Sequence, residues 1–178
     1  MKRILFSSLL LLGGLCSALS AEQPEPTAGE QFSFVQMCDT QLGMGGYEHD
    51  VKTFTLAVEQ INKMKPDFVV ICGDLVNQAN EQSWLDFNKI KSGFVIPCHC
   101  AARNHDVANV PTAESLKLYR EKVGKDYYSV EHKGFTFVIA NTQLWKAPLK
   151  GESEKRSEEH TSELQSRRNL VCRLLLEK

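Results

Sequence analysis

Three short polar runs in the sequence contain residue types that bind metal ions and transfer protons. Each run follows an apolar segment, and together they supply carboxylates, amides and one imidazole. They are Asp39-Thr40-Gln41, Gly73-Asp74 and Asn104-His105-Asp106. Oxygen-rich clusters with an imidazole suit Mn, Fe, Zn or Mg better than soft metals. Two such ions about 3.5–4 Å apart, bridged by one carboxylate, can hold a hydroxide and clamp an in-line displacement at phosphorus.

An alternation of strands and helices must position these runs. Strands are predicted at residues 32–38, 68–72 and 94–102, and helices at residues 51–65, 80–91 and 112–124. The helices place apolar residues three or four positions apart. Residues 68–72 are instead apolar throughout, as in a strand buried on both faces. Residues 127–132 and 135–141 flank Lys133-Gly134 and predict a hairpin with a two-residue turn.

This order of elements predicts an α/β fold with a mainly parallel sheet and a terminal hairpin. In such a sheet, ligands bind at the edge where loops leave the carboxyl ends of the strands. All three polar runs follow predicted strands, so we expect them to meet at that edge. Asp and Asn also serve simply to close turns and cap helices, but three sets at successive strand ends favour a functional cluster.

At these residues the sequence resembles a known family. Asp39-x-Gln41, Gly73-Asp74 and Asn104-His105-Asp106 resemble the D-x-H, G-D and G-N-H-D blocks of the calcineurin-like metallophosphoesterases. Gln41 in place of histidine is similar to a D-x-Q branch that includes calcineurin-like Ser/Thr protein phosphatases. Residues 111–116, 126–129 and 141–144 also look like that branch, and the resemblance extends over residues 32–148.

The resemblance implies a dinuclear metal centre and a phosphoester substrate. Asp39 and Gln41 would hold the first of two divalent ions, Asp74 would bridge them, and Asn104 would hold the second. The ions would be Mn, Fe, Zn or Mg. The implied reaction is metal-dependent hydrolysis of a phosphate monoester or diester.

The same resemblance implies that His105 and Asp106 are catalytic. His105 would protonate the leaving alcohol, and the Asp106 carboxylate would orient its imidazole. A carboxylate can orient an imidazole and raise its basicity. An imidazole also suits proton transfer because its ordinary pKa of about 6.5 lies near the operating pH.

The sequence departs from the family pattern in two places. Arg103 stands where the motif has glycine, which predicts a strained turn or a sequence error, or alternatively a bidentate contact with phosphate. The family's later G-H-x-H block is absent. We therefore interpret the chain as the N-terminal half of an αββα sandwich and expect it to be inactive as it stands. The alternative is an exported, catalytically inactive binding module of the same fold.

Both ends of the chain differ in character from residues 32–155, which form the predicted partial phosphoesterase domain. Residues 1–21 read as a secretory signal peptide, with a short basic start, an apolar run and small residues before the cut. Residues 22–31 predict a linker, and residues 156–178 resemble translated sequencing-adapter and vector sequence. The protein is therefore expected to be secreted or periplasmic, with no membrane span after cleavage.

The charge balance and the positions of the cysteines argue against two kinds of binding site. Residues 22–155 contain 14 lysines and arginines against 18 aspartates and glutamates, without a basic cluster. A nucleic-acid-binding surface is therefore not expected. Cys98-His99-Cys100 lies on a predicted strand, where neighbouring side chains point to opposite faces, so we expect buried thiols there and no zinc site.

Overall fold

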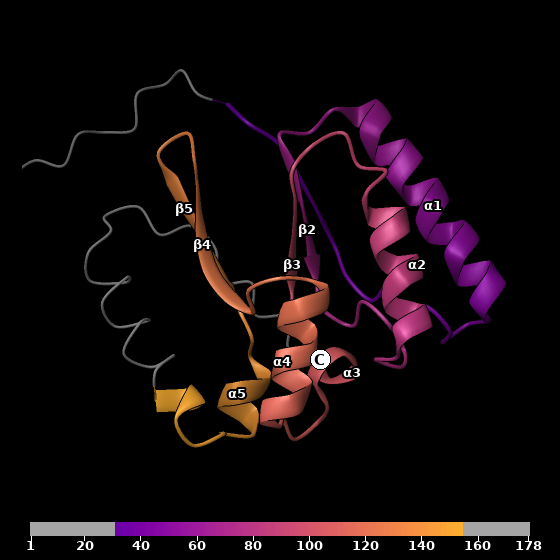
Figure 1. Cartoon of the computed structure of the whole chain (residues 1–178). Coiled ribbons are helices and arrows are strands. Elements are labelled where there is room, and N and C mark those ends of the chain that lie inside the picture. Colours follow the sequence, from indigo (N-terminus) through magenta and orange to yellow (C-terminus); the bar gives the residue numbers. More distant parts are fainter. Residues whose placement is uncertain (1–30, 155–178) are drawn as a thin grey trace, which may run out of the picture. The chain divides into compact units, whose positions relative to one another are not determined.

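The computed structural model describes residues 31–154, which alternate between strands and helices (Figure 1). The strands are β1 (Phe34–Met37), β2 (Phe68–Cys72), β3 (Cys98–Ala101), β4 (Tyr127–His132) and β5 (Phe135–Ala140). The helices are α1 (Tyr47–Met64), α2 (Glu81–Lys91), α3 (Asn104–Val107), α4 (Ala113–Lys122) and α5 (Gln143–Lys146). The predicted signal peptide and tail lie outside the described residues, as does the predicted linker apart from Gln31.

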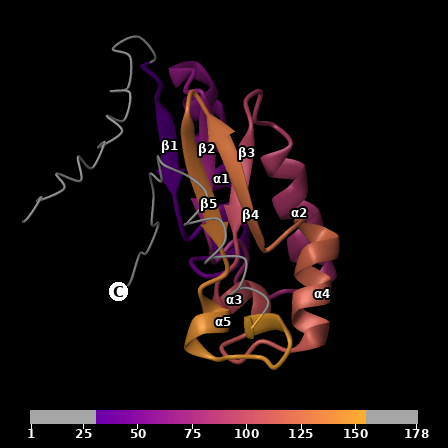
Figure 2. The ribbon, with the colours of Figure 1, turned by 90° about the vertical axis from the view of Figure 1, so that its left-hand side faces the viewer.

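The strands form two separate sheets. β1, β2 and β3 pair in parallel and in that order, whereas β4 and β5 form an antiparallel hairpin. This confirms the predicted α/β architecture. α1 and α2 lie on one side of the parallel sheet and the hairpin lies on the other (Figure 1). Seen from the hairpin side, β4 and β5 lie in front of the parallel strands, and α3 and α5 lie beyond one end of them (Figure 2).

One face of the parallel sheet packs against α1 and α2. In α1 the buried residues Phe54, Val58 and Ile61 recur at helical spacing, so that one side of the helix faces the sheet. Their partners include Val69 and Ile71 of β2, which are completely buried. None of the helices within residues 31–154 is long and apolar enough to cross a membrane.

The other face of the sheet packs against the hairpin through aromatic rings. Phe34 of β1 stacks on Phe68 of β2 with ring centroids 5.1 Å apart. Phe137 of β5 meets Phe68 edge to face at 4.9 Å. Val70 of β2 and Ile139 of β5 complete the buried cluster. β2 is therefore buried on both faces, as its continuous apolar sequence predicts.

The predicted elements are confirmed, but some of their boundaries move. The third strand begins at Cys98 rather than at residue 94. Val95 is 80% exposed, and the residues before Cys98 form a connecting segment in place of a paired strand. α1 begins at Tyr47, four residues before the apolar periodicity starts at residue 51. The one-turn helices α3 and α5 were not predicted, because four residues are too few to show a period.

Candidate active site at the strand ends

The loops after the three parallel strands are joined to one another by hydrogen bonds. The Asp39 N–H donates to the Gly73 carbonyl at 3.2 Å, and the Gln41 N–H donates to the Asp74 carbonyl at 2.9 Å. The His105 N–H donates to Oδ1 of Asp74 at 3.2 Å, which ties the start of α3 to the second loop. The predicted meeting of the three polar runs at one sheet edge is therefore what the structure shows.

The backbone at this edge has positive φ angles, which residues other than glycine rarely adopt. Asp39, Gln41 and Asp74 have φ angles of 54°, 35° and 50°, next to Gly73 at 82°. Such backbone costs of order 1–3 kcal/mol per residue and concentrates at functional sites. Sequence reasoning missed this signal, although aspartate adopts a positive φ more readily than most residues other than glycine.

Arg103 places its guanidinium between the two aspartates. Its Nη1 lies 2.7 Å from Oδ2 of Asp74 and 3.0 Å from Oδ1 of Asp39. The Asp74 side chain is only 5% exposed, whereas those of Asp39 and Arg103 are 36% and 31% exposed. The predicted strained turn at Arg103 is wrong, because its φ of −139° and ψ of −172° are ordinary extended values. The strain lies in the two other loops.

The side chains at this site can be compared with the ligands that a divalent ion requires. Two carboxylates with the nearby amides of Gln41 and Asn104 are the oxygen donors that hard divalent ions prefer. The cation between Asp39 and Asp74 is nevertheless the Arg103 guanidinium. No group of three or more His, Cys, Asp or Glu side chains able to hold a metal occurs within residues 31–154. In this arrangement the residues do not fit a metal ion bound by both carboxylates.

The two amide candidates lie at the edge of this cluster. Gln41 belongs to the first loop, and its backbone is fixed by the bond to Asp74. Asn104 is the first residue of α3. Both residues are partly buried. The structure thus brings Asp39, Asp74 and Arg103 into direct contact and leaves Gln41 and Asn104 beside them.

His105 is oriented by a backbone carbonyl and not by Asp106. Its Nδ1 lies 2.9 Å from the Asn77 oxygen, and because a carbonyl only accepts hydrogen bonds, Nδ1 carries the hydrogen. Nε2 is then the ring atom left to exchange a proton. The predicted pairing with Asp106 is not what the structure contains, since adjacent helical residues do not face each other. No sequence signal marks the carbonyl of Asn77 as the partner.

Asp106 instead joins two loops from inside the protein. It is 1% exposed, and its carboxylate accepts the N–H groups of Arg103 and Leu75, each at 2.9 Å. A longer bond of 3.4 Å comes from Val76. Burial raises the pKa of Asp106 to about 7, against the opposite effect of these backbone donors. Asp106 therefore fixes the loop after β2 to the turn before α3.

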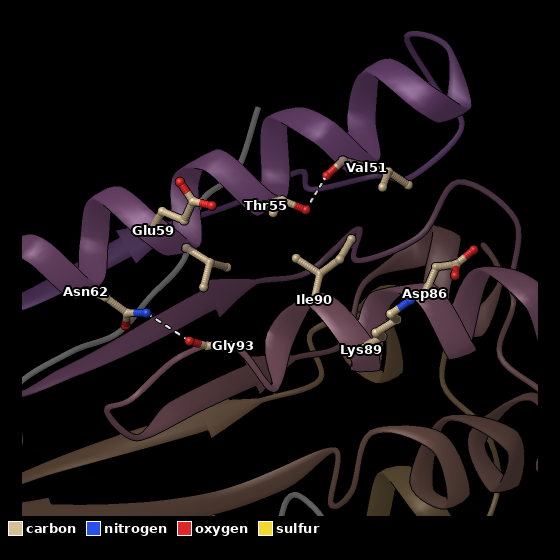
Figure 3. A pocket seen from close by; sticks show the side chains of 9 residues that line it. Val51, Thr55, Glu59, Asn62, Asp86, Lys89, Ile90 and Gly93 are labelled. Atoms are coloured by element: carbon tan, nitrogen blue, oxygen red, sulfur yellow. Dashed lines mark hydrogen bonds between the residues drawn. The ribbon is translucent and has the colours of Figure 1, made fainter.

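A groove elsewhere on the molecule lies between α1 and α2. It has a volume of about 410 Å³. It is lined by Val51, Thr55, Val58, Glu59, Asn62, Asp86, Lys89, Ile90 and Gly93. Figure 3 shows Thr55 bonded to the carbonyl of Val51, and Asn62 bonded to that of Gly93 at the far end. None of the strand-end residues lines this groove.

Comparison with known proteins finds a matching family model and several similar proteins. The model of the calcineurin-like phosphoesterase family matches residues 32–168. The serine/threonine-protein phosphatase CPPED1 of Homo sapiens is 30% identical over 169 residues, which cover 83% of this chain and 54% of that protein. CPPED1 of Danio rerio is 33% identical over 136 residues, covering 64% and 44%. The chain thus spans about half the length of the curated relatives it matches.

Among solved structures, a purple acid phosphatase from yellow lupin (Lupinus luteus) seeds is similar to part of the chain. The TM-score is 0.48 at 20% sequence identity, and the match covers 78% of this chain and 29% of the lupin chain.

Proposed function

The chain belongs to the calcineurin-like phosphoesterase family, and from this premise we propose that the protein hydrolyses phosphoesters at the edge formed by the three strand ends. The observation that carries the proposal is the convergence of Asp39, Asp74 and His105 from three separate loops. The relatives are called serine/threonine-protein phosphatases, so a phosphorylated serine or threonine is the first natural substrate class to test.

His105 supports the proposal through the state of its ring. The Asn77 carbonyl holds Nδ1–H, so Nε2 is the atom that can give a proton to a leaving alcohol. The bond from the His105 N–H to Asp74 ties α3, which carries this ring, to the second loop. General acid catalysis of this kind contributes about 10²–10⁴-fold in rate.

The two divalent ions remain a prediction, with Asp39, Gln41, Asp74 and Asn104 as their ligands. The family is metal-dependent, yet an ion between Asp39 and Asp74 and the guanidinium of Arg103 exclude each other. Export to the periplasm or outside the cell is likewise proposed, from the predicted signal peptide alone.

A second candidate function is a catalytically inactive binding module. The observation that favours it is the position of Arg103, whose single positive charge faces the two negative charges of Asp39 and Asp74. These three side chains leave a formal charge of −1. A dianionic phosphate would be repelled from a site of that charge unless further positive charge enters.

Hydrolysis of p-nitrophenyl phosphate and of its bis-ester, with millimolar Mn²⁺, separates the two candidates. The gene is first re-sequenced past residue 155. The assay then compares the protein that this sequence encodes with the 178-residue chain. We expect turnover by the gene product and a loss of about 10²-fold or more in His105→Gln. His49→Gln, which changes an exposed histidine on α1, is the matched control. Binding of substrate without turnover by either protein, or full activity of His105→Gln, would overturn the proposal.

A further inference from the structure

The side chain of Arg103 occupies the place between Asp39 and Asp74 that a divalent ion would need. We propose that Arg103 is a built-in competitor for divalent cations, which weakens metal binding at this pair of carboxylates. The inference rests on the proposed function, since it concerns metal binding at the same site. It adds a residue that sets metal affinity and is not itself a ligand.

The guanidinium is held by both carboxylates through one nitrogen. Nη1 carries two hydrogens, which suffice for Oδ2 of Asp74 at 2.7 Å and Oδ1 of Asp39 at 3.0 Å. Charge-assisted bonds of this length are about twice as strong as bonds between neutral groups. The partner in the shorter bond is nearly buried, with 5% of the Asp74 side chain exposed, so solvent screens it little. A metal ion must break both bonds before it can use these oxygens.

The aliphatic part of Arg103 is also fixed. A Cβ built on Gly73 would lie 2.5 Å from Cβ of Arg103 and 3.4 Å from its Cδ, so the side chain passes directly over the Gly73 backbone. The first atoms of the side chain therefore rest on the second loop while the last atoms reach the first loop and Asp74. Contact at both ends directs the guanidinium to the two aspartates.

The backbone at residue 103 does not require arginine or exclude glycine. Its φ of −139° is open to any residue, and its N–H bond to Asp106 is made by the main chain. Arg103→Gly is therefore expected to remove the competing cation and to keep the main chain of the turn as it is. The two carboxylates are then left without their cation, which is the arrangement that favours a divalent ion.

Mn²⁺ binding to the full 178-residue chain, measured by electron paramagnetic resonance of the free ion, tests this inference. We expect Arg103→Gly to bind Mn²⁺ at least about tenfold more tightly than the unmodified chain. Arg103→Lys keeps a positive charge and is expected to remain weak. Lys117→Gln removes one positive charge from the exposed side of α4 and controls for net charge. Adding Asp74→Asn to Arg103→Gly should abolish the gain.

Thermal unfolding gives a second readout and guards against a folding defect. Mn²⁺ should raise the midpoint of Arg103→Gly more than that of the unmodified chain. Arg103→Gln, which keeps most of the side chain, serves if Arg103→Gly does not fold. Equal Mn²⁺ affinity with and without Arg103, or binding by neither protein, would overturn the inference. Metal binding without hydrolysis would leave it intact and count only against the proposed function.

Discussion

Gly73→Ala offers a quantitative test of how closely the second and third strand-end loops approach. A Cβ at position 73 would lie 2.5 Å from Cβ of Arg103, a distance that real side chains do not adopt. The φ of Gly73 is +82°, which disfavours any L side chain independently of this clash. The substitution therefore combines a backbone cost with a steric cost, and the two can be measured separately.

The chain contains a matched control for the backbone cost. Gly134 in the hairpin turn has a φ of +81°, and a Cβ there would meet nothing within 4 Å. Left-handed backbone costs a non-glycine residue roughly 1–2 kcal/mol, so Gly134→Ala should lower the free energy of unfolding by about that amount. Forcing extra atoms into a packed site costs typically 1–3 kcal/mol, so Gly73→Ala should lose roughly 2–5 kcal/mol.

A double-mutant cycle with Arg103→Gly isolates the clash. Without the Cβ and Cδ of Arg103, the two atoms at 2.5 and 3.4 Å are gone, and the backbone nitrogen of residue 103 remains 3.3 Å from the new Cβ. Gly73→Ala should then cost roughly 1–2 kcal/mol, so the coupling energy is about 1–3 kcal/mol. Urea unfolding of the full chain, followed by tryptophan fluorescence, to which the buried Trp84 contributes, measures each variant. If Gly73→Ala cost the same with arginine or glycine at position 103, the described approach of the two loops would be refuted.

Two further predictions concern hydrogen bonds away from the strand-end site. The Ser33 N–H, more than any other neighbour, lowers the pKa of Asp67 to about 2. A carboxylate with a lowered pKa stabilises the fold above its ordinary pKa of about 4, and this contribution is lost as the pH falls towards 2. The melting temperature should therefore fall less between pH 4.5 and 2 in Asp67→Asn than in the unmodified chain or the exposed control Glu59→Gln; an equal fall would contradict it. Tyr128→Phe removes the oxygen that accepts the Cys100 N–H at 3.1 Å, and it should cost about 1–3 kcal/mol in urea unfolding. A loss below about 0.5 kcal/mol would show that the bond is dispensable.

The helices and the hairpin were predictable because their signals are local. Asn80 starts α2 by accepting the Ser83 N–H at 2.9 Å. Thr112 and Ser115 cap α4 reciprocally, with bonds of 2.9 and 3.1 Å. The hairpin turn is marked by Gly134, which takes the positive φ of 81° that such a turn favours, whereas the φ of 47° at Lys133 does not follow from its residue type. In each case the residues that decide the structure lie within four positions of one another.

The third strand shows where local patterns stop being sufficient. Residues 94–97 are as apolar as a strand, yet pairing with β2 begins only at Cys98, opposite Val69. Instead, the Val95 N–H donates to the side chain of Asn62, which lies on α1, 33 positions earlier in the sequence. Which backbone groups join the ladder is therefore decided by a partner that no local pattern identifies. The predicted alternation further along is present, since Cys98 and Cys100 pack towards the helices while the His99 ring lies near Phe68.

The strand-end site likewise has some features that could be predicted from the sequence and others that could not. Parallel topology alone was enough to predict that Asp39, Asp74 and His105 meet, because it fixes which loops share an edge. Topology does not fix the direction of a long side chain, so the contact of Arg103 with both aspartates could not be read from spacing. The partner of His105 escaped for a related reason, since it is a main-chain carbonyl 28 positions away.

Arg103 also explains why the prediction of strain was attached to the wrong residue. A motif glycine suggests that position 103 needs an unusual backbone, but the close approach there is between two loops and involves two residues. At such a contact only one of the two residues needs to lack a Cβ. Gly73 supplies that absence, and the Cβ of Arg103 fills the space. Arginine in place of the motif glycine is tolerated by the backbone at position 103, and it brings a fixed positive charge to the two carboxylates. Its effect should therefore appear as weaker metal binding and not as a change in the geometry of the turn.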